Sequence, residues 1–396
     1  MTVKLTMLAE HRDALEKCVF CPKLCRAACP VSNAEPSESL TPWGKMSTAY
    51  FVAGGSAPAD DDSASLAWAC TGCLGCRELC DHKNPVADVL FDARAAHTLA
   101  GHSPAAARAV ADDAEAHRKR HRVAIAELDP RRSEAIEASP GGLRLLLGCG
   151  YAEAEPSAAR AAMAVTKALY GDGCTLVEEC CGYPLLAAGD LAGFRAQAER
   201  LAREVAGAHP LVVLDPGCAR TLSHHYARMT PPIEVVTPEL LLDRVARSLD
   251  KLEPSAGPSA VHRWHDPCQL GRGLGKYDEP RAILKRALGE ENVAEPERAR
   301  ERAECSGGGG LVPQTMPAVS DAIAGARLEE HERLGGGVIV TGCASSLARF
   351  KKSGSHAMDL IEVVARALGV APAPSSAAEN DDDGGPVSGP RSRRQG

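Results

Sequence analysis

Eight cysteines fall in two short runs near the start of the chain. The run CVFCPKLCRAACP at 18–30 has the spacing C-x2-C-x3-C-x3-C followed by proline, and CTGCLGCRELC at 70–80 has C-x2-C-x2-C-x3-C. The second spacing is that of bacterial ferredoxins, in which the fourth cysteine ligates the other cluster of a pair. The first run keeps the ferredoxin proline but has one extra residue in its middle gap.

The two runs together therefore predict two 4Fe-4S clusters with exchanged ligands. We expect the runs to pack together around a pseudo-twofold axis. The first cluster is assigned to Cys18, Cys21, Cys25 and Cys80, and the second to Cys70, Cys73, Cys76 and Cys29.

Zinc is the main alternative at these cysteines. Two zinc ions would each accept four thiolates, and C-x2-C pairs are common at such sites. Zinc gives no reason for the third and fourth cysteine of each run or for the proline, so the iron–sulfur interpretation is favoured. Disulfides are the least favoured, because they are rare in cytosolic proteins.

Composition limits the other classes of function. The chain has 396 residues, 44% of them hydrophobic and only 4% aromatic, 16 cysteines and a net charge of −7. The mild acidity argues against a nucleic-acid surface. The first 18 residues lack the apolar run of a signal peptide, and no stretch of transmembrane length is found. We therefore expect a cytoplasmic protein, with a peripheral position at the inner face of the membrane as a further option.

The remainder of the chain predicts α/β units with mainly parallel sheets, because short apolar strands alternate with amphipathic helices. A helix is expected from Ser103-Pro104 to about 128, and its histidines in AHRKRH (116–121) are interpreted as a solvated face. Strands are expected at 143–149, 175–180, 211–218, 261–268 and 337–343. Helices are expected at 157–171, 190–207, 279–289, 319–335 and 357–369.

An internal repeat organises the later cysteines. ECCG (179–182) precedes PGC (216–218), and ECSG (304–307) precedes TGC (341–343), with 38 positions from Cys180 to Cys218 and from Cys305 to Cys343. Each copy opens with a cysteine at a strand end. The first copy offers Cys149, Cys180, Cys181 and Cys218 as ligands of a cluster or metal, against the alternative of four buried thiols. The second copy offers the weaker set Cys268, Cys305 and Cys343.

These motifs resemble the CCG cysteine-rich domains of the heterodisulfide reductase and glycolate oxidase iron–sulfur subunit family. The shared elements extend over roughly 15–370 and include CPV (29–31), TPWGKM (41–46) and NPVADVLFDAR (84–94). The family motif is C…CCG…C-x-x-C, and this chain departs from it. Asp215 and Val340 occupy the first position of the final C-x-x-C in the two copies, and Ser306 replaces the second cysteine of CCG.

The resemblance implies a dicluster ferredoxin-type domain at 1–98, a helical linker at 99–141, CCG domains at 142–256 and 257–370, and a tail at 371–396 that its composition predicts to be disordered. It implies an electron-transfer subunit, which takes electrons from an FAD-linked dehydrogenase and passes them to a quinone or a membrane-linked acceptor. The alternatives are an enzyme that reduces a disulfide at the CCG site, and a zinc-stabilised scaffold. Beyond the two 4Fe-4S clusters, the CCG domains would hold a further iron–sulfur cluster, zinc or nothing.

Four further features of the sequence allow only general predictions. His265 is either a ligand or proton donor or a hydrogen-bonded turn residue, and Cys174 is expected to be a core thiol. Arg272 and the glycine run 307–310 are candidates to line a pocket. The run is not a phosphate loop, because no Lys-Ser/Thr follows it. No catalytic residue is assigned.

Overall fold

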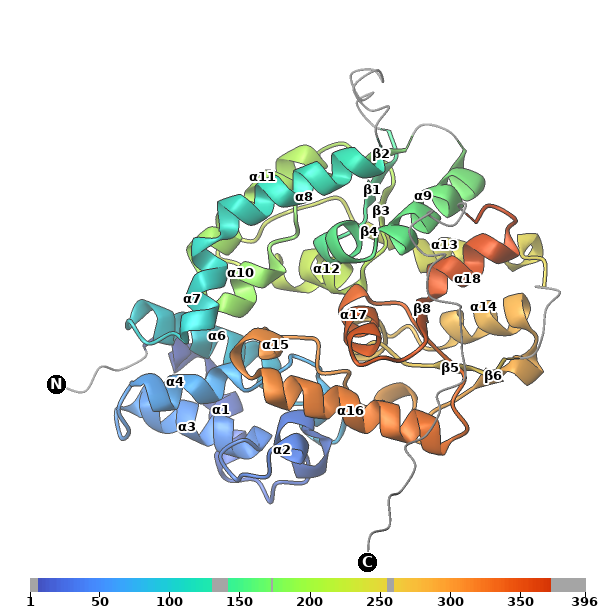
Figure 1. The fold of residues 1–396 in the computed structure, drawn as a ribbon. Coiled ribbons are helices and arrows are strands. Elements are labelled where there is room, and N and C mark those ends of the chain that lie inside the picture. Colours follow the sequence, from blue (N-terminus) through green and yellow to red (C-terminus); the bar gives the residue numbers. More distant parts are fainter. Residues whose placement is uncertain (1–5, 130–141, 172–173, 255–259, 372–396) are drawn as a thin grey trace, which may run out of the picture.

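The computed structural model describes residues 6–129, 142–171, 174–254 and 260–371. Helices and parallel sheets make up the fold, as expected. The N-terminal part is helical and lies at one end of the molecule (Figure 1). Its helices are α1 (Arg12–Val19), α2 (Pro30–Ala34), α3 (Pro42–Gly54), α4 (Asp61–Trp68), α5 (Gly75–Glu78) and α6 (Val86–Leu99).

Two four-stranded parallel sheets follow, one in each repeat. Their strand orders are β2-β1-β3-β4 and β6-β5-β7-β8, the same order twice. Leu145 pairs with Val212 in the first sheet, and Arg263 pairs with Ile339 in the second. The strands are β1 (Arg144–Leu146), β2 (Thr175–Leu176), β3 (Leu211–Val213), β4 (Pro238–Leu240), β5 (His262–Trp264), β6 (Val293–Ala294), β7 (Val338–Thr341) and β8 (Ala357–Asp359).

The helices of the repeats cover these sheets and also join them. In the first repeat they are α9 (Pro156–Tyr170), α10 (Tyr183–Ala188), α11 (Leu191–Glu204), α12 (Pro216–Arg220) and α13 (Leu241–Ala246). In the second they are α14 (Asp278–Leu288), α15 (Val312–Thr315), α16 (Pro317–Arg333), α17 (Ala344–Lys352) and α18 (Leu360–Ala367). Helix α9 packs on α18 and α13 packs on α14, so equivalent helices exchange partners across the seam. One continuous hydrophobic core therefore runs through both repeats.

The five predicted strands exist, but each is shorter than its apolar run. Three strands were missed, namely β4, β6 and β8. The start of the expected helix at 357–369 was wrong, because Ala357–Asp359 pairs with β7 before the helix begins at Leu360. Strands of two or three residues are too short to show a period, so a sequence gives little sign of them.

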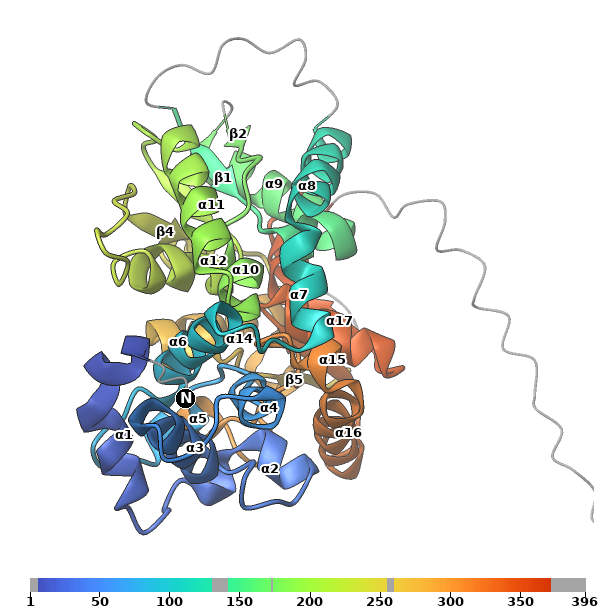
Figure 2. The same cartoon turned by 90° about the vertical axis from the view of Figure 1, so that its left-hand side faces the viewer.

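The expected linker helix is two helices, α7 (Ala105–Asp112) and α8 (Ala114–Leu128). They run from the N-terminal part along the first repeat (Figure 2), and α8 packs on α9 and on the π-helical turn η4 (Gly150–Ala154). Most of the remaining linker and nearly all of the predicted disordered tail lie outside the described residues. Within the described ranges, no helix has the length and apolar character needed to cross a bilayer.

Arg94 on α6 joins the N-terminal part to both repeats. Its side chain has no exposed surface, and it donates hydrogen bonds to the carbonyls of Cys70, Ala187 and Gly310 at 2.7, 2.9 and 2.9 Å. Burial lowers the pKa of Arg94 to about 10, so the guanidinium stays charged at neutral pH. The three units therefore converge on one buried cation.

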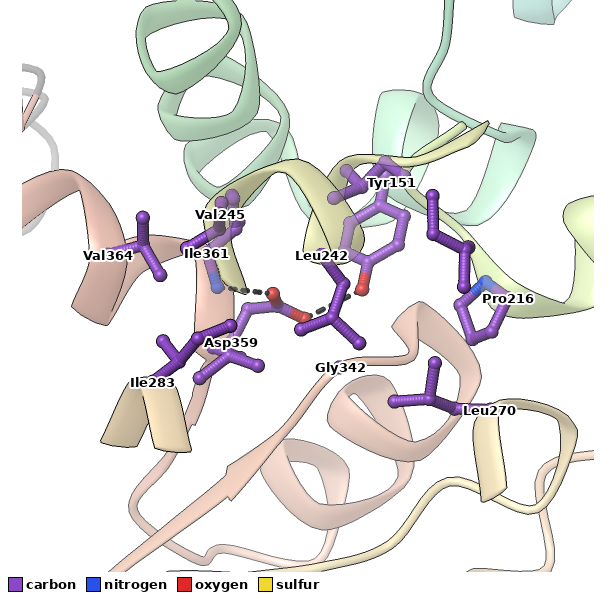
Figure 3. A pocket seen from close by; sticks show the side chains of 13 residues that line it. Tyr151, Pro216, Leu242, Val245, Leu270, Ile283, Gly342, Asp359, Ile361 and Val364 are labelled. Carbon is purple, nitrogen blue, oxygen red and sulfur yellow. Dashed lines mark hydrogen bonds between the residues drawn. The ribbon is translucent and has the colours of Figure 1, made fainter. Parts of the chain in front are cut away.

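A small apolar pocket marks the seam between the repeats (Figure 3). Two buried polar side chains meet there, and the Tyr151 hydroxyl donates a 2.7 Å hydrogen bond to Asp359. The other Asp359 oxygen accepts from the Ile361 amide and caps α18. Burial raises the pKa of Asp359 from its ordinary value of 3.8 to about 7.

This carboxyl predicts a pH dependence of stability. Between about pH 4 and pH 7 the folded chain retains a proton that the unfolded chain has lost, so the free energy of unfolding falls as pH rises. Asp359→Asn can still cap α18, but its side chain does not titrate, so this contribution to the pH dependence of stability is lost. Between pH 6 and pH 8 the wild type should lose about 1 kcal/mol relative to the variant.

The measurement is anaerobic thermal unfolding of both proteins across this pH range. Asp13→Asn, at an exposed carboxylate, is the control. Parallel pH profiles for wild type and Asp359→Asn would show that the carboxyl does not titrate as described.

Candidate metal centres

All 16 cysteines lie in the described residues, and none forms a disulfide. The first run places its cysteines around a helix end and two turns. Cys18 lies on α1, and its sulfur accepts a 2.9 Å hydrogen bond from the Asn84 amide. Cys29 is the N-cap of α2, with Pro30 at the first helical position. Proline suits that position because its missing amide is not needed there, which gives the CP pair a structural reason.

The second run lies in the loop after α4 and on the short helix α5. Cys70 and Cys73 are in the loop, Cys76 is on α5, and Cys80 follows α5. Helix α5 contacts the 3-10 turn η2 (Arg26–Ala28), which lies between the third and fourth cysteines of the first run. The two runs thus pack against each other.

The cysteines that shift the pKa of each thiol identify its neighbours. They define two groups, and each group contains cysteines from both runs. Burial and then the neighbouring Cys25, Cys80 and Cys21 raise the pKa of Cys18 to about 12. Burial and then Cys73, Cys70, Cys29 and Cys25 raise the pKa of Cys76 well above its ordinary value. Cys80 therefore lies with the first run and Cys29 with the second, which is the arrangement that exchanged ligation requires.

The surroundings of the group that contains Cys70 and Cys29 suit an anionic cluster. Buried thiolates that repel one another need a cationic partner, and soft thiolates prefer iron–sulfur clusters, zinc or Cu(I). The ammonium group of Lys45, a residue only 3% exposed, lies 3.4 Å from the Cys29 sulfur. Lys45 and Arg94 also act to lower the pKa of Cys70, although burial raises it overall. Buried cations beside the sulfurs fit an anionic cluster.

In the first repeat four sulfurs form a chain from strand end to helix start. Cys149 precedes η4, and its sulfur lies 3.8 Å from that of Cys180. The thiol of Cys181 bonds to both Cys180 and Cys218, and these bonds lower its pKa well below the ordinary value. Gly182, with φ at 82°, turns the chain so that both adjacent cysteines reach the site. All four lie beyond the carboxyl ends of parallel strands, where α/β sheets place their ligands.

The second repeat has the same backbone with fewer sulfurs. Cys268 precedes the π-helical turn η7 (Gln269–Gly273) as Cys149 precedes η4. The Gly307 amide donates to the Cys305 sulfur at 3.3 Å, as the Gly182 amide donates to Cys180 at 3.4 Å. The two sites are therefore built on one template.

The structure corrects the predicted equivalence of Cys343 with Cys218. Cys343 is the N-cap of α17 and its sulfur accepts from the Ser346 amide, just as Asp215 is the N-cap of α12 and accepts from the Cys218 amide at 3.0 Å. Cys343 therefore matches Asp215, and Ser346 matches Cys218. Val340 is a buried residue of β7 and has no place in the motif. The equal spacing of 38 misled because the segment between the CCG turn and the final helix is longer in the second repeat: Cys305 lies 38 positions before Cys343, whereas Cys180 lies 35 positions before Asp215.

A serine pair fills the corner that sulfurs occupy in the first repeat. The hydroxyls of Ser306 and Ser346 are 2.9 Å apart and buried. Cys181 and Cys218 meet at the equivalent point. The second site is thus left with three sulfurs. Of these, Cys305 bonds to Cys73 of the N-terminal part, and this bond is the main cause that lowers the pKa of Cys73.

The other residues that the sequence analysis singled out make packing contacts and hydrogen bonds. Arg272 donates to the carbonyls of Cys73 and Ala303 at 2.7 and 2.6 Å, and it lines a pocket together with Cys305. The glycine run lies against the loop of the second run, where a Cβ on Gly310 would come within 2.2 Å of the Cys70 carbonyl oxygen. His265 packs edge-on against Phe350, and Cys174 is half-buried at the margin of the core.

The histidines of α8 were predicted wrongly. His121 is fully buried, and His117 bonds to the thiol of Cys149 and pairs with Glu153 at 3.3 Å. These bonds raise the pKa of His117 to about 10. The bond with the Cys180 thiol, and then that with His117, lower the pKa of Cys149 to about 5 although burial opposes them. The spacing H-x3-H was the signal that could have found this face, because it places both rings on one side of a helix.

A further group of potential ligands joins the N-terminal part to the first repeat. Asp88 lies within 3.2 Å of His224, with His225 beside it. Arg228 and Arg220 approach the same carboxylate to 3.2 and 3.8 Å. Although burial opposes it, His224, Arg228 and His225 lower the pKa of Asp88 to about 2. Two guanidinium groups disfavour a metal ion here, so we interpret the group as an ion cluster between domains.

Comparison with known proteins agrees with this architecture. A 4Fe-4S dicluster domain model matches residues 14–84, and a cysteine-rich domain model, CCG, matches 144–223 and 262–351. The chain belongs to the heterodisulfide reductase-related iron–sulfur proteins that join a dicluster domain to two CCG domains. The predicted resemblance is thus confirmed.

Curated relatives include subunits of larger oxidoreductases. The chain is 26% identical over 357 residues to a subunit of the fumarate reductase (CoM/CoB) of Methanothermobacter marburgensis, a match that covers 86% of this chain and 68% of the relative. It is 28% identical to a subunit of the dihydromethanophenazine:CoB–CoM heterodisulfide reductase of Methanosarcina barkeri, with 49% of this chain and 50% of the relative covered. The EtfAB:quinone oxidoreductase of Syntrophomonas wolfei is 38% identical over 26% of this chain and 14% of its own length. The chain thus spans about two thirds or less of these relatives.

Exchanged ligation predicts a specific pattern of iron loss. Cys80→Ala should remove the cluster of Cys18, Cys21 and Cys25, although Cys80 belongs to the other run. Cys29→Ala should remove the cluster of Cys70, Cys73 and Cys76. Each variant should lose about four irons and one of two electron paramagnetic resonance (EPR) signals on reduction.

Cys174→Ala, at a half-buried cysteine outside both groups, is the matched control and should keep all iron. A third variant, Cys70→Ala, identifies the signal of the second group. If Cys80→Ala removed the same signal as Cys70→Ala, each run would hold its own cluster and the exchange of ligands would be wrong.

Proposed function

We propose that the chain is the electron-transfer subunit of a larger oxidoreductase and carries two 4Fe-4S clusters in its N-terminal domain. When bound, such clusters accept and release single electrons. The observation that carries the proposal is the convergence of the eight N-terminal sulfurs in two mixed groups, with buried cations around one of them.

These cations give the two groups different electrostatic surroundings. The group of Cys70 lies near Lys45, Arg94 and Arg272, which favour added negative charge. The nearest polar partner at Cys18 is the neutral amide of Asn84. Charge and hydrogen bonds around the sulfurs tune potential, so we infer a higher potential at the inner group, that of Cys70, than at the outer group, that of Cys18.

An apolar surface beside the outer group supports entry of electrons there. Phe20 and Leu24 lie between its cysteines in the sequence, and their exposed fractions are 80% and 62%. Leu79, next to Cys80, is 41% exposed. Exposed large apolar side chains in a group are typical of interaction sites. We propose that an FAD-linked dehydrogenase subunit binds here and that its reduced flavin gives up electrons one at a time.

From the inner group the contacts continue into the second repeat. The Cys73–Cys305 contact and the Arg272 bonds make a hydrogen-bonded route from the N-terminal domain toward the CCG sites. We propose that electrons leave from the CCG side to a quinone or another acceptor, with the chain peripheral to the cytoplasmic face of the membrane. The first repeat, with four sulfurs, is the better candidate for a third cluster or a zinc ion, and the second repeat lacks sulfur at its serine corner.

The alternative is a reductase that cleaves a disulfide at a CCG site. The family relationship to heterodisulfide reductase subunits favours it. The replacements Asp215, Ser306 and Ser346 remove sulfurs from both sites, so we rank it second.

Anaerobic isolation of the tagged chain from its source tests the first proposal. A flavoprotein should co-purify and should reduce the chain when its substrate is added. Phe20→Asp combined with Leu24→Asp should abolish co-purification while iron content stays unchanged. Leu99→Asp, at a 77% exposed leucine on α6, should have no effect.

Turnover of a low-molecular-weight disulfide by the isolated chain, with reduced viologen as the electron donor, would instead support the reductase. Co-purification that survives both surface substitutions would refute the proposed entry surface.

A further inference from the structure

Helix α8 closes one side of the first repeat's site with two histidines. His117 and His121 are four residues apart, so both lie on the face that packs against η4. Their rings are nearly parallel, with an interplanar angle of 17° and centroids 6.4 Å apart. A pair of histidines at this helical spacing is a recurrent metal-binding arrangement.

His117 is held in a geometry typical of metal ligands. Its Nε2 lies 3.3 Å from Glu153 Oε1, and the ring also bonds to the Cys149 thiol. Ligating histidines usually donate their other ring N–H to a carboxylate, which fixes the ring and its tautomer. The same arrangement is present here: the Glu153 carboxylate, which η4 supplies, contacts the His117 imidazole, and the imidazole contacts the sulfur site.

His121 gives a second, independent observation. Its side chain has no exposed surface, and neither ring nitrogen has a hydrogen-bond partner among the described residues. Glu153 Oε1 is 3.6 Å from its Nδ1, too far for a hydrogen bond. A buried imidazole whose nitrogens have no partners is destabilising, because it has lost its hydrogen bonds to water. A bound group between α8 and the sulfurs would provide the missing partner.

The site is also open on this side. A cleft of about 750 Å³ is lined by His117, Cys180 and Gly182, together with α7, α10 and α15 residues. The sulfur that the family motif provides is replaced by Asp215, whose carboxylate is already engaged in capping α12. A nitrogen donor on α8 would compensate for that lost sulfur.

We propose that His117 is a ligand of the metal centre in the first CCG domain, which therefore has a mixed nitrogen and sulfur donor set. This rests on the proposal that the first repeat binds metal, and not on the N-terminal clusters. An imidazole in place of a thiolate removes one negative charge, and in other iron–sulfur centres histidine ligation raises the potential. The helix that precedes the first repeat thus contributes to its site.

Pulsed EPR of the reduced full chain, purified anaerobically and labelled with 15N-histidine, tests the assignment. The wild type should show a histidine nitrogen coupling that belongs to neither N-terminal cluster. His117→Gln should lose this coupling and the metal of the first repeat. His117 is 26% exposed, so the substitution should be tolerated in folding.

His102→Gln is the matched control, because this histidine pairs with Asp61 in the N-terminal part at 3.0 Å. The two N-terminal cluster signals serve as an internal measure of folding in every variant. If the isolated chain holds zinc in the first repeat, zinc-edge X-ray absorption should show imidazole scattering that disappears in His117→Gln.

An all-sulfur or sulfur and oxygen shell in the wild type, or full retention of the histidine coupling in His117→Gln, would overturn the assignment. So would a first repeat without metal in a chain whose two N-terminal clusters are intact. That last result would leave the electron-transfer function standing, whereas a chain without iron would remove the function itself.

Discussion

Buried thiolates repel one another, and this repulsion is the constraint on which the structure depends. The chain brings sulfurs from distant segments into common groups, away from water, where burial disfavours the charged form of a thiol. Burial and the neighbouring sulfurs raise the pKa of Cys18 to about 12 and that of Cys25 to about 11. A bound metal cation would offset both the burial of the thiolates and their mutual repulsion. The positions of the sulfurs are therefore suited to metal centres.

The local backbone devices follow from the need to aim several sulfurs inward. Cys29 and Cys343 use N-cap positions, and Cys149 and Cys268 precede π-helical turns. Glycines with positive φ follow Cys181 and Ser306 at equivalent points. In the two repeats, Cys149, Cys268 and Cys343 follow the carboxyl ends of β1, β5 and β7. The parallel sheets hold these ends at one edge, and the shared core of the two repeats fixes them relative to each other.

Sequence reasoning is strongest where ligand spacing alone carries the information. The N-terminal groups follow from two local runs, and the expected exchange of Cys29 and Cys80 follows from the ferredoxin pattern. The α/β repeats followed from alternating strands and helices. What could not be predicted depends on lengths and contacts that leave no local pattern. The longer segment between the CCG turn and the final helix of the second repeat hid the equivalence of Cys343 with Asp215. His117 reaches Cys149 only because α8 folds back over the first repeat, and Arg94 meets carbonyls from three parts of the chain.

Iron and acid-labile sulfide in the anaerobically purified full chain, together with EPR after reduction, test the central claim most directly. We predict about eight irons and a matching amount of sulfide from the two N-terminal groups, with more when the first repeat is loaded. The reduced protein should show the signals of two cubane clusters. A colourless protein that contains zinc and no sulfide would contradict the account.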